Sequence, residues 1–171
     1  MKNSNHIKKL VLTALFAAIT CIFTMIHLFP SPLGGYIHIG DCFVLLSGFY
    51  LGPVYGAFAA GIGSSLADLF AGYPTYAVAT FIIKFVMALV AALIVKGMSK
   101  MRFPIIGNNV GGIVAEVIMV GGYYLFSAVF LGAGFEAGLA TIPGDFFQGG
   151  MGIVFAIVIS EILRKSKADK I

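Results

Sequence analysis

The sequence predicts an all-α integral membrane protein, a bundle of six transmembrane helices that forms a single domain over residues 1–171. Composition is the first reason: 60% of the residues are hydrophobic, 11% are charged, and the mean hydropathy is +1.02. A soluble domain usually has about a quarter of its residues charged. The second reason is that long apolar runs without strict alternation favour helices over a barrel, whose strands alternate with period two. The third is the 22 glycines, which suit close helix packing in lipid.

Six apolar segments are expected to cross the membrane. They cover about residues 7–29, 40–51, 54–71, 76–96, 106–131 and 143–163. The first segment is too long for a signal-peptide core and lacks a small-residue cleavage site, so it is counted as a span. A spanning helix needs about 20 residues, so the second segment must start above the hydrocarbon core or be shielded by its neighbours.

Basic residues predict the orientation. Of the 11 lysines and arginines, all except Lys84 lie at the start of the first segment, around the connection between the fourth and the fifth, or after the sixth. The positive-inside rule makes that side cytoplasmic, so both termini are expected in the cytoplasm. We expect these charges to set the orientation of the chain in the membrane. The lipid bilayer is therefore an expected partner, and nucleic acid is not.

The short loops and the absence of signature motifs argue against an enzyme. No soluble nucleotide-binding or catalytic domain fits between the segments, and no GxxxxGK[ST], HExxH or GxSxG motif occurs. Cys21 and Cys42 lack metal-ligand spacing and are expected to be buried as small apolar residues. We therefore expect no catalytic residue, no metal site and no cofactor.

An acid and a base stand inside the third and fourth segments, at Asp68 and Lys84. Ionisable groups in hydrocarbon are costly and usually mark a substrate or ion site. Both fall in the outer half of antiparallel neighbours, so Asp68 is the expected partner of Lys84. The pair is predicted to form one wall of an outward-opening pocket, with a purely structural ion pair as the alternative.

Other segments bring polar groups to the same outer level. The candidate substrate-binding residues are Lys84, Asp68, Gln148, Tyr123, Tyr124, Asp145, Tyr76, Thr80 and His38. The tyrosines could equally belong to an interfacial aromatic belt, and Asp145 could cap the last helix. Asp41 is expected mainly to cap the second helix. Glu116 lies deeper, where a packing role and a gating role both stay open.

The first segment carries a patch of small residues, with Ala14 and Ala18 one helical turn apart. Such small-xxx-small patches allow close contact between helices in lipid. A similar ridge, formed by Gly56, Ala60 and Ser64 in the third segment, is expected to pack within the bundle.

One long stretch carries a family resemblance. Residues 34–84, GGYIHIGDCFVLLSGFYLGPVYGAFAAGIGSSLADLFAGYPTYAVATFIIK, resemble the substrate-binding S component of energy-coupling factor (ECF) vitamin transporters. The alanine patch and the PGDFFQGGMG start of the last segment support the resemblance. The chain is most similar to the branch assigned to vitamin B6 or hydroxymethylpyrimidine, with pantothenate members as near neighbours. It lacks the look of the riboflavin or biotin members.

The resemblance implies a function that residue spacing does not supply. S components reside in the plasma membrane of prokaryotes and bind a vitamin from outside under a lid of outer loops. A membrane scaffold subunit and two cytoplasmic ATPases then drive delivery inward, and the S component is thought to topple. Carried over, Ala14 and Ala18 would contact the scaffold, residues 30–39 would form the lid, and the outer halves of the last three segments would line the pocket.

Two other classes stay open on the sequence. A stand-alone secondary transporter could use Asp68 and Lys84 as a proton-coupled pair, although no second half of matching hydropathy is seen. An intramembrane enzyme could use the same pair with Asp145. Within the transporter reading, Lys84 could meet the carboxylate of pantothenate as readily as it could hydrogen-bond a single-ring vitamin.

Overall fold

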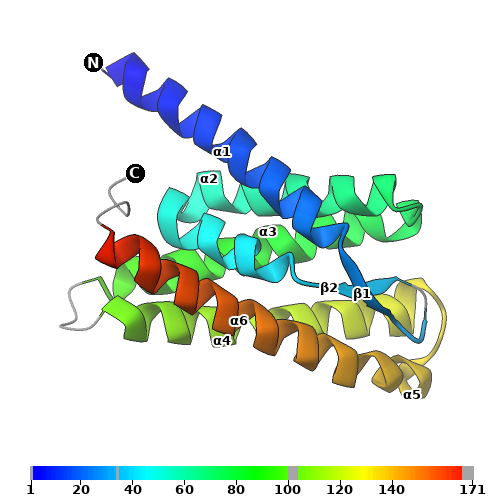
Figure 1. The fold of residues 1–171 in the computed structure, drawn as a ribbon. Helices are drawn as coiled ribbons and strands as arrows, with labels where there is room; N and C mark the ends of the chain where they lie inside the picture. Colours follow the sequence, from blue (N-terminus) through cyan, green and yellow to red (C-terminus); the bar gives the residue numbers. More distant parts are fainter. Residues whose placement is uncertain (1, 34, 100–103, 167–171) are drawn as a thin grey trace.

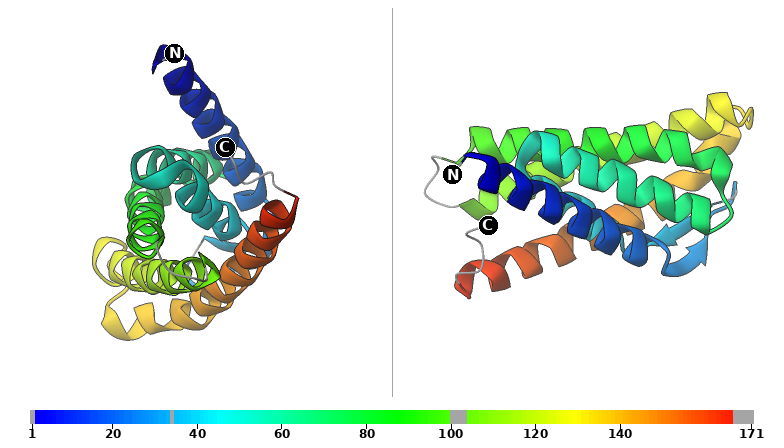
Figure 2. Two further views of the ribbon diagram at one scale, coloured as in Figure 1. Left: turned by 90° about the vertical axis from the view of Figure 1, so that its left-hand side faces the viewer. Right: turned by 90° about the horizontal axis from the view of Figure 1, so that it is seen from above.

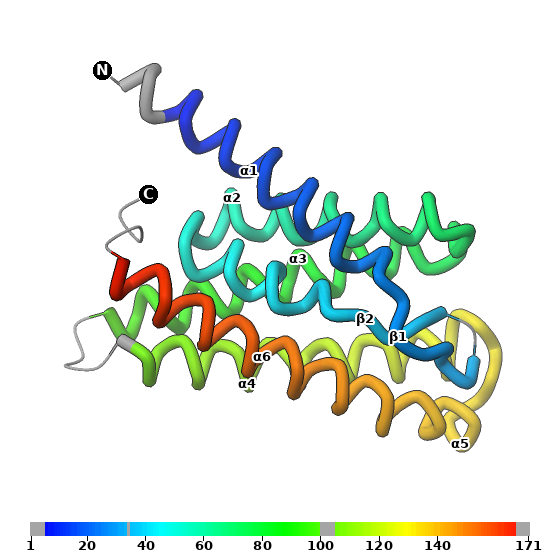
Figure 3. The backbone as a smooth tube through the Cα atoms, viewed as in Figure 1, coloured from blue at the N-terminus to red at the C-terminus, as the bar shows by residue number. Residues whose placement is uncertain are grey.

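The computed structural model describes residues 2–33, 35–99 and 104–166. Long helices pack along one another, and a small hairpin of two strands covers one end (Figures 1 and 3). The elements are α1 (Lys2–Thr24), β1 (His27–Pro30), β2 (Tyr36–His38), α2 (Asp41–Phe70), α3 (Pro74–Gly97), α4 (Pro104–Leu125), the π-helical turn η1 (Phe126–Phe130), α5 (Phe135–Gly138), the short η2 (Leu139–Thr141) and α6 (Ile142–Lys165).

Helix α2 contains the second and third predicted segments. Gly52 interrupts it with φ 80° and ψ −175°, a conformation that glycine adopts easily, and Pro53 has no N–H to continue the helical ladder. The chain reverses here, so that residues 41–51 form a first arm and residues 53–70 a second arm (Figure 3). Ser47 in the first arm donates a hydrogen bond to the Gly56 carbonyl of the second, at 3.0 Å.

The structure thus confirms a mostly helical membrane protein but not the count of six. Among the described residues, five helical stretches are long and apolar enough to cross a membrane, and α2 is one of them. The sequence placed a boundary at Gly52 and Pro53 and counted two spans there. The boundary is present as a sharp reversal: Gly52 is non-helical, and it divides α2 into two helical arms.

Close backbone approach holds α2 against its neighbours α1 and α3. A Cβ at Gly48 would lie only 2.6 Å from the Ala88 carbonyl oxygen of α3, and a Cβ at Gly63 only 2.4 Å from the Ala17 carbonyl oxygen of α1. The predicted small-residue ridge on the second arm is buried, as expected. Small residues therefore set the helix spacing here, as is typical of packing in lipid.

The two ends of the bundle differ. The start of α1 and the end of α6 lie at one end, and the β-hairpin and α5 lie at the other (Figure 1). Helix α1 slants away from the bundle toward its N-terminus (Figure 2). The predicted outer loop over residues 30–39 is part of this hairpin, in which β1 and β2 pair antiparallel with His27 opposite His38.

Candidate functional site

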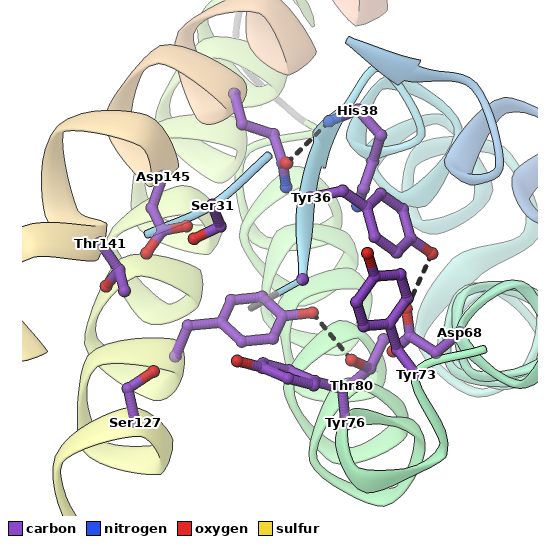
Figure 4. A pocket seen from close by; sticks show the side chains of 13 residues that line it. Ser31, Tyr36, His38, Asp68, Tyr73, Tyr76, Thr80, Ser127, Thr141 and Asp145 are labelled. Atoms are coloured by element: carbon purple, nitrogen blue, oxygen red, sulfur yellow. Dashed lines mark hydrogen bonds between the residues drawn. The ribbon is translucent and has the colours of Figure 1, made fainter. Parts of the chain in front are cut away.

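A pocket lies beneath the hairpin, at the end of the bundle away from the termini. Its volume is about 50 Å³. It is lined by Ser31, Gly35, Tyr36, His38, Asp68, Tyr73, Tyr76, Thr80, Tyr123, Ser127, Thr141, Asp145 and Gln148. These residues come from the hairpin, from α2, α3, α4, η1, η2 and α6, and from the turn between α2 and α3, so the pocket forms only when this end of the bundle is assembled (Figure 4).

The hairpin is tied across the pocket by hydrogen bonds to the helices. The Tyr36 hydroxyl in β2 donates to Asp68 Oδ1 at the end of α2, at 2.9 Å. The Tyr76 hydroxyl at the start of α3 donates to the Leu33 carbonyl in the hairpin turn, also at 2.9 Å. With these bonds the hairpin has the position that a lid over the pocket requires.

Aromatic rings make up much of the wall. The rings of Tyr36 and Tyr73 lie 5.1 Å apart, and those of Tyr73 and Tyr76 lie 6.4 Å apart in an edge-to-face arrangement. The Tyr123 hydroxyl donates to Thr80 Oγ1 at 3.1 Å, which fixes its ring on the α4 side. A flat ligand can therefore meet ring faces from several sides.

A buried ion pair lies beneath the pocket. The Lys84 ammonium group donates to Asp41 Oδ1, both side chains are 0% exposed, and Lys84 Nζ also contacts Met119 Sδ at 3.0 Å. Gln148 Nε2 donates to Asp41 Oδ2 at 2.7 Å, and Gln148 Oε1 accepts the backbone N–H of His38 at 3.0 Å. Gln148 thus connects strand β2 to the ion pair.

Two expectations about these acids are wrong. Asp68 is not the ion-pair partner of Lys84, because Asp68 accepts from Tyr36 while Asp41 holds the ammonium group. The reversal at Gly52 explains this, since it brings the start of α2 beside the middle of α3. Asp41 is not a helix cap either: no side-chain cap is present at that helix start, and its carboxylate oxygens face Lys84 and Gln148.

Seven of the nine predicted substrate-binding residues line the pocket. The exceptions are Lys84 and Tyr124. Lys84 is sealed below the pocket with 0% exposure. Tyr124 points away and donates to the Phe135 carbonyl at 3.3 Å. Adjacent residues on a helix point in directions about 100° apart, so Tyr123 and Tyr124 could not both face the same cavity.

The sequence missed a further set of pocket residues, namely Ser31, Gly35, Tyr36, Tyr73, Ser127 and Thr141. Tyr73 carries no signal in the sequence beyond that of a belt residue. The hairpin was expected to form a lid, but apart from His38 none of its residues was predicted to bind substrate. Ser127 and Thr141 lie in a π-helical turn and a 3-10 turn, where helical periodicity offers no signal.

The hairpin side of the pocket carries no positive charge among the described residues. Burial lowers the pKa of His38 to about 4, so the imidazole is neutral at physiological pH. Its Nδ1 accepts the backbone N–H of Gly40 at 3.1 Å, a bond that requires the unprotonated nitrogen. Burial, followed by the neighbouring Asp68 carboxylate, raises the pKa of Tyr36, which therefore stays a hydrogen-bond donor.

Glu116 lies deeper than the pocket, as its place in the sequence suggested. It is buried on α4, and both carboxylate oxygens lack a hydrogen-bond partner among the described residues. A Cβ at Gly149 would lie 3.0 Å from Glu116 Oε2, so the small residues of α6 make room for this side chain.

Comparison with known proteins now identifies the family. The model of the family "ECF-type riboflavin transporter, S component" matches residues 4–165. The chain belongs to this family. It is a transporter S component and not an enzyme, as the sequence indicated. The expectation that it lacks the look of the riboflavin members is wrong at the level of the family.

Individual relatives agree with this assignment. A Pyrococcus woesei protein named "Uncharacterized protein in gap 3'region" is 34% identical over 143 residues, which cover 83% of this chain and 92% of that protein. The "Thiamine precursor transporter HmpT" of Lactococcus lactis subsp. cremoris is 26% identical over 168 residues, covering 97% and 93%. The S-component fold matches a solved structure described as "Structure and mechanism of the S component of a bacterial ECF transporter". Its TM-score is 0.70 and its identity 25%, over 95% of this chain and 99% of that one.

Proposed function

We propose that this S component captures a small, water-soluble, single-ring vitamin from outside the cell and delivers it inward as part of an ECF-type importer. Hydroxymethylpyrimidine is the first candidate, and pyridoxine, pyridoxal and pyridoxamine follow. The observation that carries the proposal is the pocket, in which tyrosine rings and placed polar groups converge beneath a hydrogen-bonded hairpin. Such a mixture of ring faces and few polar groups suits a small cofactor-like ligand.

The size of the pocket supports a single ring. A cavity of about 50 Å³ has room for about four water molecules, at roughly 10–15 Å³ for each water position. That space suits one six-membered ring with small substituents far better than three fused rings. The resemblance to the thiamine precursor transporter supports a pyrimidine over the other single-ring compounds.

The importer would work as an assembly in the plasma membrane. In this proposal the chain crosses the membrane six times, with the two arms of α2 as separate passes and both termini in the cytoplasm. Ala14 and Ala18 on α1 contact the membrane scaffold subunit, and two cytoplasmic ATPases supply the energy. The start of α1 and the end of α6 lie at the same end of the bundle, and both alanines are exposed, which supports this arrangement.

Titration calorimetry of the purified full-length chain in detergent tests the proposal. We expect tight, saturable binding of hydroxymethylpyrimidine without ATP or an ion gradient, and much weaker binding of riboflavin. Gln148→Ala should weaken binding, because Gln148 lines the pocket and links the lid to Asp41. Uptake by this chain alone that collapses with a proton uncoupler would instead favour a secondary transporter.

A further inference from the structure

We propose that the pocket selects ligands that donate hydrogen bonds to Asp68 and Asp145 and that carry no negative charge. This inference rests on the proposed function and narrows its substrate class. It favours an aminopyrimidine with a free hydroxymethyl group and excludes phosphate esters and carboxylate vitamins such as pantothenate.

Two carboxylates reach the pocket from different elements. Asp68 is at the outer end of α2 and 6% exposed, and Asp145 is in the first turn of α6. In each, Oδ2 has no hydrogen-bond partner within the described part of the chain. Figure 4 shows the two acids entering from opposite sides of the pocket. Because a buried acceptor without a donor is costly, these oxygens call for donors that the ligand can supply.

No described cation offsets these acids within the pocket lining. Lys84 is absent from the lining, is 0% exposed and is already held by Asp41. His38 is neutral and uses Nδ1 to accept from Gly40. A carboxylate or phosphate in the pocket would therefore lie near two acids with no cation to pair with, in surroundings of low dielectric constant.

The remaining polar groups can adapt to the ligand. The hydroxyls of Ser31, Tyr73 and Ser127 line the pocket and make no hydrogen bond to other described residues. A hydroxyl can donate or accept, so these groups can match ring nitrogens or a ligand hydroxyl. An aminopyrimidine with a hydroxymethyl group carries two separate kinds of donor, its exocyclic amine and its hydroxyl, so it can supply a donor for each of the two carboxylates.

A matched set of ligands tests the selection. The probes are 4-amino-5-hydroxymethyl-2-methylpyrimidine, the same compound without its amino group, its monophosphate ester, and pantothenate. Calorimetry on the full-length chain should show tight binding of the first probe and about 10- to 100-fold weaker binding without the amine, the loss expected for one hydrogen bond to a charged group. The ester and pantothenate should show no measurable binding.

Variants assign the effect to the two acids. Asp68→Asn and Asp145→Asn should each weaken the binding of the first probe about 10- to 100-fold. Each should also reduce the difference in affinity between the first probe and its phosphate ester. Tyr36→Phe removes the hydroxyl that donates a hydrogen bond to Asp68 but keeps the Asp68 carboxylate. This variant therefore shows how much of the effect of Asp68→Asn comes from losing the hydrogen bond to the hairpin and not from losing a contact with the ligand. Tyr124→Phe, outside the pocket, is the neutral control.

The outcomes separate the inference from the proposed function. Binding of the ester or of pantothenate as tight as that of the first probe would overturn the inference and leave vitamin capture intact. Unchanged affinity for the first probe in both asparagine variants would also overturn the inference and leave vitamin capture intact. If no ring compound, riboflavin included, binds to the folded chain, the proposed function fails and the inference fails with it.

Discussion

At the residue scale, the buried ammonium group of Lys84 determines the chemistry under the pocket. Asp41 accepts from it, and its Nζ lies 5.3 Å from the centre of the Tyr123 ring. A lysine in this position could have been a ligand-binding cation or a structural one. Its 0% exposure and its pairing with Asp41 favour the structural role. Lys84 therefore supports the pocket floor, and the polar groups that line the pocket above it are left to meet the ligand.

Lys84→Met should destabilise the protein by about 3–5 kcal/mol, because it leaves the Asp41 carboxylate buried without its partner. The double variant Lys84→Met with Asp41→Asn should recover much of this loss, since it removes the unpaired charge. Thermal unfolding in detergent measures both.

Arg164→Met provides the control for this experiment, because the Arg164–Glu161 pair lies on the surface, with side chains 53% and 26% exposed. Its melting temperature should stay close to that of the parent protein. A Lys84→Met protein as stable as the parent would show that the buried pair adds no stability.

At the element scale, the reversal within α2 organises the bundle. Residues before Gly52 form an arm that ends at the cytoplasmic side in our proposal, and residues after it return toward the pocket. The first arm brings Asp41 to Lys84, and the second brings Asp68 to the hairpin. One glycine with a positive φ thus positions two acids at different depths.

Gly52→Ala should cost about 1–3 kcal/mol of stability, because φ 80° with an extended ψ strains any residue that has a Cβ. Lack of space does not cause this cost, since a Cβ at Gly52 would have no other atom within 4 Å. Gly121→Ala on α4 is the matched control: the space there is equally open, and Gly121 lacks the positive φ.

Thermal unfolding of the Gly52→Ala and Gly121→Ala variants measures this difference in stability. Gly121→Ala should be neutral or slightly stabilising, since alanine is the better helix former. Equal melting temperatures for the two variants would contradict the role assigned to the reversal.

At the scale of the whole molecule, the outer surface of α1 is the natural place for a partner in the membrane. Ala14 and Ala18 are exposed there, next to Ile62 and Leu66 of α2, in a shallow apolar groove of about 560 Å³. The inner face of the same helix is already used, because Ala17 packs against Gly63. The helix can therefore hold its place in the bundle and still offer small residues outward.

Ala14→Trp should abolish co-purification with the scaffold subunit and leave vitamin affinity unchanged within about twofold, because a bulky ring blocks close helix contact far from the pocket. Val78→Trp on α3 is the control, since Val78 is 71% exposed on another helix. An Ala14→Trp protein that still assembles fully would remove α1 as the scaffold contact.

Much of this protein follows from the sequence alone. Hydropathy over continuous segments predicts the membrane helices, because a spanning segment must be apolar along its own length. Counting positions from each segment end places Asp68, Tyr123, Asp145 and Gln148 at one level, and these residues do line one pocket, although Lys84 and Tyr124 from the same level do not. The depth of a residue in the membrane depends only on its position along its own helix, so it can be predicted from the sequence.

Only the tertiary structure decided which residues meet. Asp41 rather than Asp68 holds Lys84, because the reversal at Gly52 places the start of α2 opposite the middle of α3. Tyr36 enters the site through hairpin pairing, and Tyr124 leaves it through helix rotation. Contacts of this kind depend on the relative rotation and register of separate elements, and no spacing within a single segment encodes them.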